Sequence, residues 1–179
     1  SIEWAMLEGQ RPRSAGCNAR LGEHGVTVRV PVARITTGDG ASGWGRCRAT
    51  RQEAEALLGQ PLNTLFDPTY GTLPVGLPLE LPLWDLIAKR DGQPVYQRVA
   101  AIRGKSVPDA LRVPCYDTSL YIDDLHLPHN REAAALIAEE ARQGLARGHR
   151  AFKPKIGRGA RHMSLEAGTE RDIAVIRAV

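Results

Sequence analysis

Hydrophobic and polar residues alternate along the first part of the chain, and this pattern predicts β-strands. Residues 2–7 form the first predicted strand, and residues 26–36 form a long one in which valine occupies alternate positions. Residues 37–40 carry a Gly and Asp turn signal, so we expect a hairpin whose returning strand covers residues 41–48. Residues 11–25, between the first two strands, are rich in Gly, Arg and small polar residues and predict a loop.

Helical patterns follow the predicted hairpin. Thr50 is a good N-cap, and Glu53 three residues later completes a capping box for a helix over residues 52–58. Residues 81–90 predict a second, more apolar helix. Its buried side is expected to carry Leu83, Trp84, Ile87 and Ala88.

The second half of the chain has a different order of elements. Its pattern predicts strand, helix, strand and helix over residues 112–116, 131–147, 150–156 and 165–179. Asn130 is the expected cap of the first of these helices, and Ile173 and Ile176 the expected inner residues of the second. This order is typical of the start of a parallel α/β fold. Two such units cannot close a barrel, so we expect the front part of a longer fold.

Two lysines stand out in the predicted strand over residues 150–156. The chain has 24 basic residues, of which only four are lysines, and Lys153 and Lys155 are two of those four. On a strand their side chains share one face, where mutual repulsion lowers the pKa of at least one and makes it a candidate general base. The alternative is two solvated lysines on an edge strand. Pro154 between them cannot donate a ladder hydrogen bond, which predicts a bulge or a local break in pairing.

Composition narrows the class of protein. The chain is 42% hydrophobic and 25% charged, as in ordinary soluble domains, and no apolar run approaches the roughly 20 residues of a membrane span. We expect no signal peptide at Ser1 and no membrane partner. Three widely spaced cysteines predict a reducing, cytoplasmic location.

The net charge of +4 favours an anionic small-molecule partner. Scattered arginines and only 5% aromatic residues argue against nucleic-acid binding. Glycine-rich phosphate motifs are absent from the sequence.

Several polar clusters are weaker candidates for chemistry. A metal site is conceivable at Asp123, Asp124, His126 and His129, but their spacing matches no standard motif, and we predict no metal ligands in this chain. We expect Asp117 to be a structural acceptor. The loop over residues 157–164 could offer substrate contacts, although a solvated loop is favoured for its polar residues Arg158, Arg161 and His162.

The order of these features resembles one known family. The resemblance rests on residues 34–40 with 43–45, 83–89 with 92–96, 116–119, 150–157 and 171–177. Together they are similar to the enolase superfamily, in particular its mandelate racemase and muconate lactonizing enzyme branch. The resemblance implies an α+β capping domain over residues 1–105, followed by the start of a (β/α)7β TIM-like barrel over residues 106–179. Only the first two β/α units would lie in this chain.

The resemblance also assigns roles to individual residues. Lys155 would be the base on one face of the substrate, and Lys153 would lie beside it and contact the substrate carboxylate. Candidate substrate contacts carried over from the family are Thr118, Arg20, His24, Arg46 and Arg48. Arg20 and His24 lie in the loop that matches the family's mobile capping loop.

The activity implied is Mg²⁺-dependent removal of the proton α to a carboxylate. The metal ligands and the partner base lie on later barrel strands, so we expect them beyond the end of this chain. An acid-sugar dehydratase is the first expectation, with a racemase or epimerase close behind, and a homo-oligomer as the default assembly. The alternative is a non-catalytic, truncated family member that acts as a binding or interaction protein.

Overall fold

The structure, a computed structural model, describes residues 1–11 and 14–179 and divides into two compact units. The first unit comprises residues 1–8 and 29–111, and the second comprises residues 9–28 and 112–179. The predicted loop over residues 11–25 therefore groups with the second unit, except that Pro12 and Arg13 lie outside the described residues. Helices and strands are both present, which confirms the expected mixed α/β class. The domain boundary expected after residue 105 stays a prediction.

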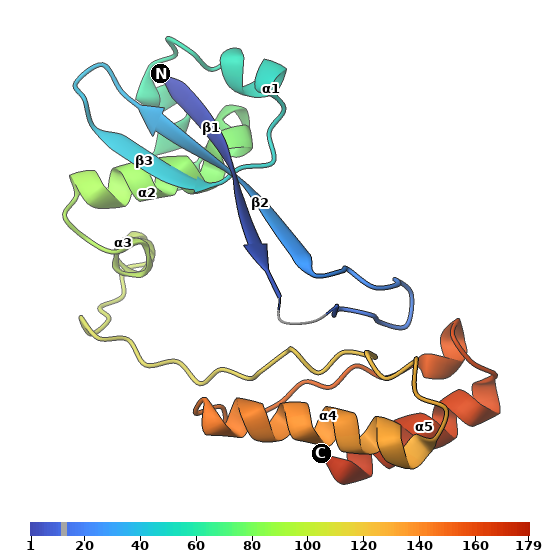
Figure 1. The fold of residues 1–179 in the computed structure, drawn as a ribbon. Coiled ribbons are helices and arrows are strands. Elements are labelled where there is room, and N and C mark those ends of the chain that lie inside the picture. The colour runs from blue at the N-terminus through green and yellow to red at the C-terminus, as the bar shows by residue number, and fades with distance from the viewer. Residues whose placement is uncertain (12–13) are drawn as a thin grey trace. The chain divides into compact units, whose positions relative to one another are not determined.

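A three-stranded sheet organises the first unit. It consists of β1 (Ile2–Gln10), β2 (Thr27–Thr36) and β3 (Ser42–Arg46) in that order (Figure 1). β2 and β3 form an antiparallel hairpin, in which Val32 lies opposite Arg46 and Thr36 opposite Ser42. The alternating pattern thus located the strands and the hairpin correctly.

Short elements connect this sheet to the helices. They are α1 (Arg51–Glu55), η1 (Leu62–Thr64), β4 (Phe66–Asp67), β5 (Gly71–Thr72) and η2 (Pro74–Leu79). The predicted capping box is present, because Thr50 Oγ1 accepts from the Glu53 N–H and a Glu53 carboxylate oxygen accepts from the Thr50 N–H. The helix it starts is shorter than the expected residues 52–58.

Helix α2 (Glu80–Arg90) lies directly on β3. A methyl group at Gly43 would be only 2.3 Å from the Leu86 nitrogen and from the Pro82 oxygen, so glycine is required there for this close approach. The Asp85 carboxylate accepts from the Trp44 N–H at 2.8 Å and so ties the helix to the strand. Helix α3 (Val95–Ile102) follows and was not predicted.

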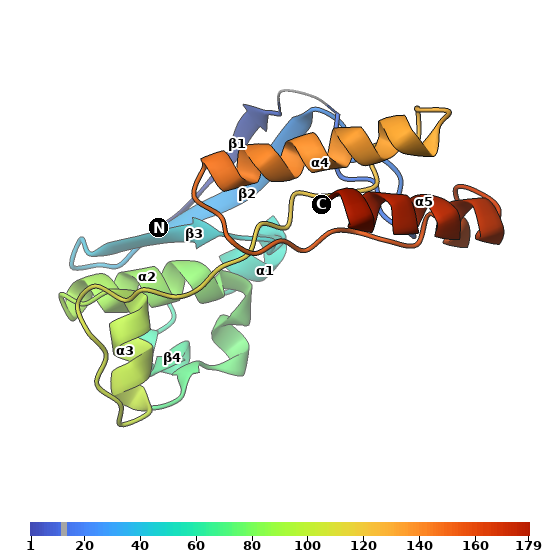
Figure 2. The ribbon, with the colours of Figure 1, turned by 90° about the horizontal axis from the view of Figure 1, so that it is seen from below.

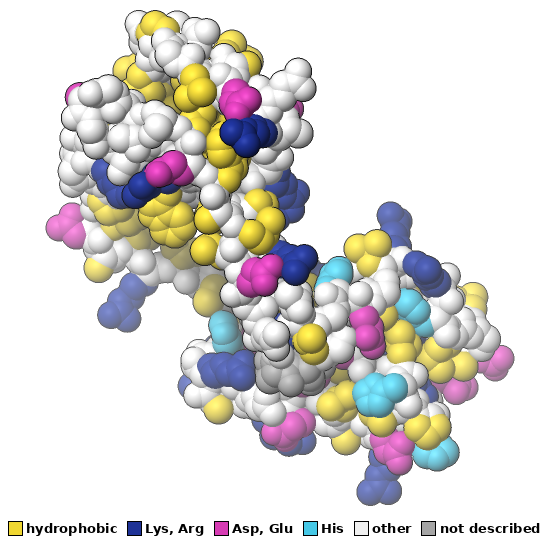
Figure 3. Space-filling view, turned by 45° about the horizontal axis from the view of Figure 1, so that its top comes forward, with side chains coloured by type: hydrophobic (Ala, Val, Ile, Leu, Met, Phe, Trp, Pro, Cys, Tyr) yellow, Lys and Arg dark blue, Asp and Glu magenta, His cyan; other side chains and the backbone are white. Residues whose placement is uncertain are grey.

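The core of the first unit lies between the sheet and α2. Leu83 and Leu86 of α2 are fully buried, while Trp84 and Ile87 are only partly buried at its edge. The Trp84 ring meets Phe66 edge to face, with 4.9 Å between ring centroids. Hydrophobic side chains also reach the surface of both units (Figure 3).

Two packed helices form the frame of the second unit. Helices α4 (Asn130–Ala146) and α5 (Leu165–Ala178) lie side by side, with the short η3 (Arg158–Ala160) before α5 (Figure 2). Their shared core contains Leu120, Ala134, Ile137, Ala141 and Val175. Ile173 and Ile176 are nearly half exposed, so the predicted inner face of α5 is wrong. Among the described residues, no helix is both long and apolar enough to cross a membrane.

Two predicted features of the second unit differ from the structure. His129, not Asn130, is the N-cap residue of α4, and its backbone is extended there. The Asn130 side chain accepts a hydrogen bond from Arg171 at 2.9 Å. Residues 112–116 and 150–156 are not strands; within the described chain a single parallel bridge joins Asp117 to Phe152. A two-stranded pairing is marginal by itself.

Candidate functional site

The two candidate lysines lie on extended backbone that pairs with residues 117–120. The Lys153 N–H donates to the Asp117 carbonyl at 2.8 Å, and the Lys155 N–H donates to the Leu120 carbonyl at 2.7 Å. N–H groups of an extended chain point alternately to opposite sides. Pro154 therefore occupies the position whose missing N–H would point away from this partner, and both lysines keep their backbone bonds.

Each lysine side chain lies over a tyrosine ring. Lys153 Nζ is 5.7 Å from the centroid of Tyr116, and Lys155 Nζ is 5.5 Å from that of Tyr121. Such cation–π contacts are attractive and hold an ammonium group in a defined place. Lys153 is exposed and Lys155 partly buried. The two tyrosines were missed as site residues, because nothing in their spacing distinguishes them from ordinary surface or core aromatics.

Asp117 is a structural residue at the start of this pairing. Its backbone N–H donates to the Ala151 carbonyl at 2.9 Å, and its carboxylate accepts from the Ser119 N–H at 2.8 Å. Burial acts to raise the pKa of the Asp117 carboxyl, but the Ser119 bonds and the nearby His149 and Arg147 outweigh burial and lower it. Thr118, the candidate carboxylate contact, is the exposed residue between Asp117 and Ser119. Its role stays a prediction.

The loop over residues 14–25 brings His24 close to Tyr121, the tyrosine that Lys155 contacts. The His24 ring meets the Tyr121 ring edge to face, with 6.2 Å between ring centroids, and Tyr121 also contacts Lys155. Gly16 allows this arrangement, because it has a φ of 101° and a methyl group there would be 2.2 Å from His24 Nδ1. Arg20 is exposed on the same loop. One unit thus brings together Lys155, Tyr121 and His24.

Arg46 and Arg48 belong to the first unit. Arg46 ends β3 and Arg48 follows it, and both side chains are exposed. They line an open groove of about 660 Å³ together with two acidic residues, Glu53 and Glu80. Their proposed contact with substrate stays a prediction.

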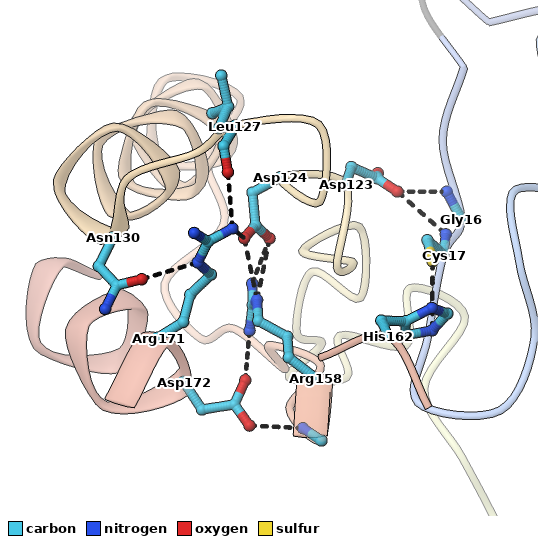
Figure 4. Close-up of polar contacts among 11 residues, drawn as sticks. Gly16, Cys17, Asp123, Asp124, Leu127, Asn130, Arg158, His162, Arg171 and Asp172 are labelled. Atoms are coloured by element: carbon cyan, nitrogen blue, oxygen red, sulfur yellow. Dashed lines mark hydrogen bonds and ion pairs between the residues drawn. The ribbon is translucent and has the colours of Figure 1, made fainter. Parts of the chain in front are cut away.

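The loop over residues 157–164 is not the solvated loop that the sequence favoured. Arg158 is fully buried and pairs with the carboxylates of Asp124 and Asp172 (Figure 4). Burial acts to lower the pKa of the Arg158 guanidinium, but its hydrogen bonds to both carboxylates outweigh burial and raise it. A buried charge needs such complete pairing, so Arg158 is a structural residue.

Neighbouring polar residues of this loop contact the backbone of residues 14–25. Arg161 donates to the Arg20 carbonyl at 2.7 Å, and His162 Nε2 lies 2.7 Å from the Asn18 carbonyl. Sequence spacing carried no signal for these contacts, because they join residues more than 140 positions apart.

The acidic pair Asp123 and Asp124 has structural partners. Asp123 accepts from the N–H groups of Gly16 and Cys17, and Asp124 pairs with Arg158. Within residues 1–11 and 14–179, no group of three or more His, Cys, Asp or Glu side chains is placed to hold a metal ion. The described residues therefore do not fit a bound Mg²⁺.

Several solved structures are similar to this chain in both sequence and fold. Galacturonate dehydratase from Geobacillus sp., in complex with D-galacturonate and 5-keto-4-deoxy-D-galacturonate, is 49% identical over 99% of this chain and 46% of its own length, with a TM-score of 0.84. A mutant of galacturonate dehydratase from Geobacillus sp. complexed with Mg gives 49% identity, 99% and 45% coverage, and a TM-score of 0.83.

A third structure carries the family name itself. The mandelate racemase/muconate lactonizing protein from Geobacillus sp., complexed with magnesium and tartrate, is 48% identical over 99% of this chain and 46% of its own, with a TM-score of 0.84. More distant structures, at 18% to 22% identity and TM-scores of 0.54 to 0.63, support the fold alone. Comparisons with protein-family models and with curated proteins found no match.

These findings confirm the resemblance to the enolase superfamily that the sequence predicted. Within the superfamily, the similar proteins are galacturonate dehydratase and a mandelate racemase/muconate lactonizing protein. The chain spans about 45% of the length of these proteins.

Proposed function

We propose that the protein carrying this chain is an acid-sugar dehydratase, a lyase, that acts on a hexuronate such as D-galacturonate. The observation that supports this most is 49% identity over 99% of the chain, at a TM-score of 0.84, to galacturonate dehydratase. The positive net charge of +4 suits an anionic substrate. A racemase or epimerase of the same family, an isomerase, is the closest other reaction.

Within this proposal, the second unit is the first part of a β/α barrel. The parallel bridge between Asp117 and Phe152 supports it, because adjacent strands of such a barrel run parallel. Lys153 and Lys155 directly follow this bridge, and catalytic residues of barrel enzymes lie at the carboxyl ends of strands. Residues 1–105 would then be the capping domain.

The reaction follows from the two ligands named for the related dehydratase. D-galacturonate has a hydrogen on C5, next to the carboxylate, whereas the product has a ketone at C5 and no hydroxyl at C4. In our proposal Lys155 removes the C5 proton, and the C4 hydroxyl takes up a proton and leaves, so that the hydrogen and hydroxyl lost by the sugar together form one water. The resulting enol becomes the ketone by proton transfer to C4. Lys153 and Thr118 would hold the carboxylate during this step.

We also propose Mg²⁺ as the cofactor, because two of the related structures are complexed with magnesium. Since the described residues of this chain do not form a metal site, the ligands would have to lie outside them. A cytoplasmic location and a homo-oligomer stay predictions.

Proton exchange in D₂O tests the proposal. The protein carrying this chain is incubated with Mg²⁺ and D-galacturonate or an aldarate, and NMR follows loss of the α-proton and formation of the deoxy-keto product. We expect Lys155→Met to lower the rate by about 10²- to 10⁴-fold, the usual contribution of a general base. Lys105→Met, which replaces an exposed lysine of the first unit, is the matched control and should leave the rate unchanged.

Three results separate the candidate functions. Exchange without loss of water would favour racemisation or epimerisation over dehydration. Exchange retained in Lys155→Met would remove Lys155 from the mechanism. No exchange with any hexuronate or aldarate would favour the alternative of a non-catalytic binding protein.

A further inference from the structure

The loop over residues 14–25 is fastened to the segment that carries Asp123. The carboxylate oxygen Oδ1 of Asp123 accepts from the Gly16 N–H at 2.9 Å and from the Cys17 N–H at 3.0 Å (Figure 4). Next to it, the Ile122 N–H donates to the Cys17 carbonyl at 2.8 Å. Ile122 is fully buried and Cys17 is 2% exposed, so water does not compete for the hydrogen bond between their backbones.

A second attachment comes from His162. Its Nε2 lies 2.7 Å from the Asn18 carbonyl, and because a carbonyl can only accept, Nε2 carries the proton and donates it. The same nitrogen is 3.7 Å from Cys17 Sγ, whose thiol donates to the Leu21 carbonyl at 3.6 Å. The loop is thus held from two sides of Cys17.

Both attachments start from the same buried ion-pair network. Asp123 precedes Asp124, which pairs with Arg158. The backbone N–H of His162 donates to the Arg158 carbonyl at 3.1 Å. Arg158 and Asp124 are fully buried, which fixes their positions. Asp123 and His162 are therefore held in place by residues that have no contact with the proposed substrate.

The attached loop positions a candidate substrate contact. His24 packs against Gly16, whose N–H is one of the two bound by Asp123, and the His24 ring touches Tyr121. Tyr121 in turn lies under Lys155. The attachment of Gly16 and Cys17 thus decides where His24 lies relative to the proposed base.

We propose that Asp123 and His162 are positioning residues that hold the loop over residues 14–25 in its substrate-binding conformation before the substrate arrives. This inference rests on the proposed function and on the sequence-based expectation that His24 and Arg20 contact the substrate. A binding loop that is already ordered does not have to be ordered during binding. Loss of an attachment should therefore weaken substrate binding more than it slows the chemical step.

Two measurements on the protein carrying this chain test the positioning. The first is the pair KM and kcat for D-galacturonate with Mg²⁺, and the second is the rate at which iodoacetamide alkylates Cys17, followed by peptide mass spectrometry. Burial, followed by the nearby carboxylates of Asp123 and Glu23, raises the pKa of the Cys17 thiol, so alkylation is slow while the loop is attached.

We expect Asp123→Ala and His162→Ala each to raise KM and the Cys17 alkylation rate by about tenfold, with kcat changed by less than about threefold. Asp123→Asn and His162→Gln keep an acceptor and a donor at the same places and should restore most of the KM. His162→Gln should also restore slow alkylation, whereas Asp123→Asn removes a carboxylate that raises the Cys17 pKa, so the His162 variants are the ones whose alkylation rate reports on the loop alone. Glu139→Ala, which removes an exposed carboxylate of α4 that pairs with Arg142, is the control and should change neither.

Unchanged Cys17 alkylation in both alanine variants would overturn the inference, whether or not the protein acts on a hexuronate. Faster alkylation with an unchanged KM would also overturn it, because loop order would then not matter for binding. If the parent protein turns over no acid sugar, the proposed function fails, and the alkylation rates alone decide whether Asp123 and His162 hold the loop. His162→Ala keeps the test valid should Asp123→Ala unfold.

Discussion

The two units of this protein bury different kinds of side chain. The core of the first unit consists of hydrophobic residues, and it has ion pairs, such as Arg90 with Asp39, outside that core and in contact with solvent. The second unit buries three charged residues, Asp124, Arg158 and Arg171, beside its small hydrophobic core. Surface ion pairs contribute little to stability, whereas breaking a buried pair leaves a charge without compensation. The second unit should therefore be sensitive to single polar substitutions that the first unit tolerates.

The sharpest test of this difference is Asp124→Ala. The substitution leaves Arg158 fully buried with only Asp172 as an acidic partner, and we expect the free energy of unfolding to fall by about 3–5 kcal/mol. Urea unfolding measures it. Asp39→Ala, which removes the surface partner of Arg90, is the control and should leave the urea midpoint nearly unchanged. Equal losses in the two variants would show that the units do not differ in this way.

In the first unit, the feature expected to be most sensitive to substitution is the close packing of β3 against α2. In Gly43→Ala, the new methyl group would lie 2.3 Å from backbone atoms of α2, so the helix must move away from β3. We expect a loss of about 1–3 kcal/mol in the free energy of unfolding, typical of overpacking. Gly38→Ala is the control, since a methyl group there meets nothing within 4 Å. A Gly43→Ala variant as stable as the control would contradict the close contact.

A smaller effect is expected at the start of α1. Thr50→Ala removes the side-chain acceptor of the Glu53 N–H, which should lower the free energy of unfolding by about 1 kcal/mol. Thr50→Ser keeps the hydroxyl and should keep the stability. Thermal unfolding of the two variants measures the difference, and identical midpoints would show that the cap contributes nothing.

The smallest expected effect is the acid response of Asp117. Because the folded protein lowers the pKa of this carboxyl below its ordinary value of 3.8, the carboxylate stabilises the fold above that pH. This stabilisation is lost as the pH falls through the lower pKa of the folded state. Asp117→Asn should therefore show a flatter decline of the urea midpoint in this acid range. The same acid decline in variant and parent would rule out the contribution.

Sequence patterns predicted the first unit better than the second for a physical reason. Strands β2 and β3 and helix α2 each have a more buried and a more exposed face, so their periodicity follows their environment. The inner face of α5 carries Gly168, Arg171 and Val175, and a hydrophobic pattern cannot point to a buried arginine. Helix α3 buries little beyond Ala100 and has no side-chain cap, so neither a hydrophobic pattern nor a capping residue predicted it.

Some residues of the candidate site could be proposed from the sequence, and others could not. Lys153 and Lys155 are candidates because lysine is rare in this chain and because the motif resembles a known family, and their roles stay predictions. Tyr121, Asp123 and His162 were not found in their present roles, since each acts through a contact with the loop over residues 14–25, far away in the sequence. Such contacts depend on tertiary packing, for which a single sequence offers no spacing rule.

Pro154 has a consequence for the register of the chain. If residues 150–156 slipped by one position against residues 117–120, Pro154 would face the partner and could not donate the hydrogen bond that Lys153 or Lys155 now donates. The slipped alignment would also turn both lysine side chains to the opposite face. A proline at this position therefore disfavours the misaligned pairing, through the absence of a donor and not through an added contact.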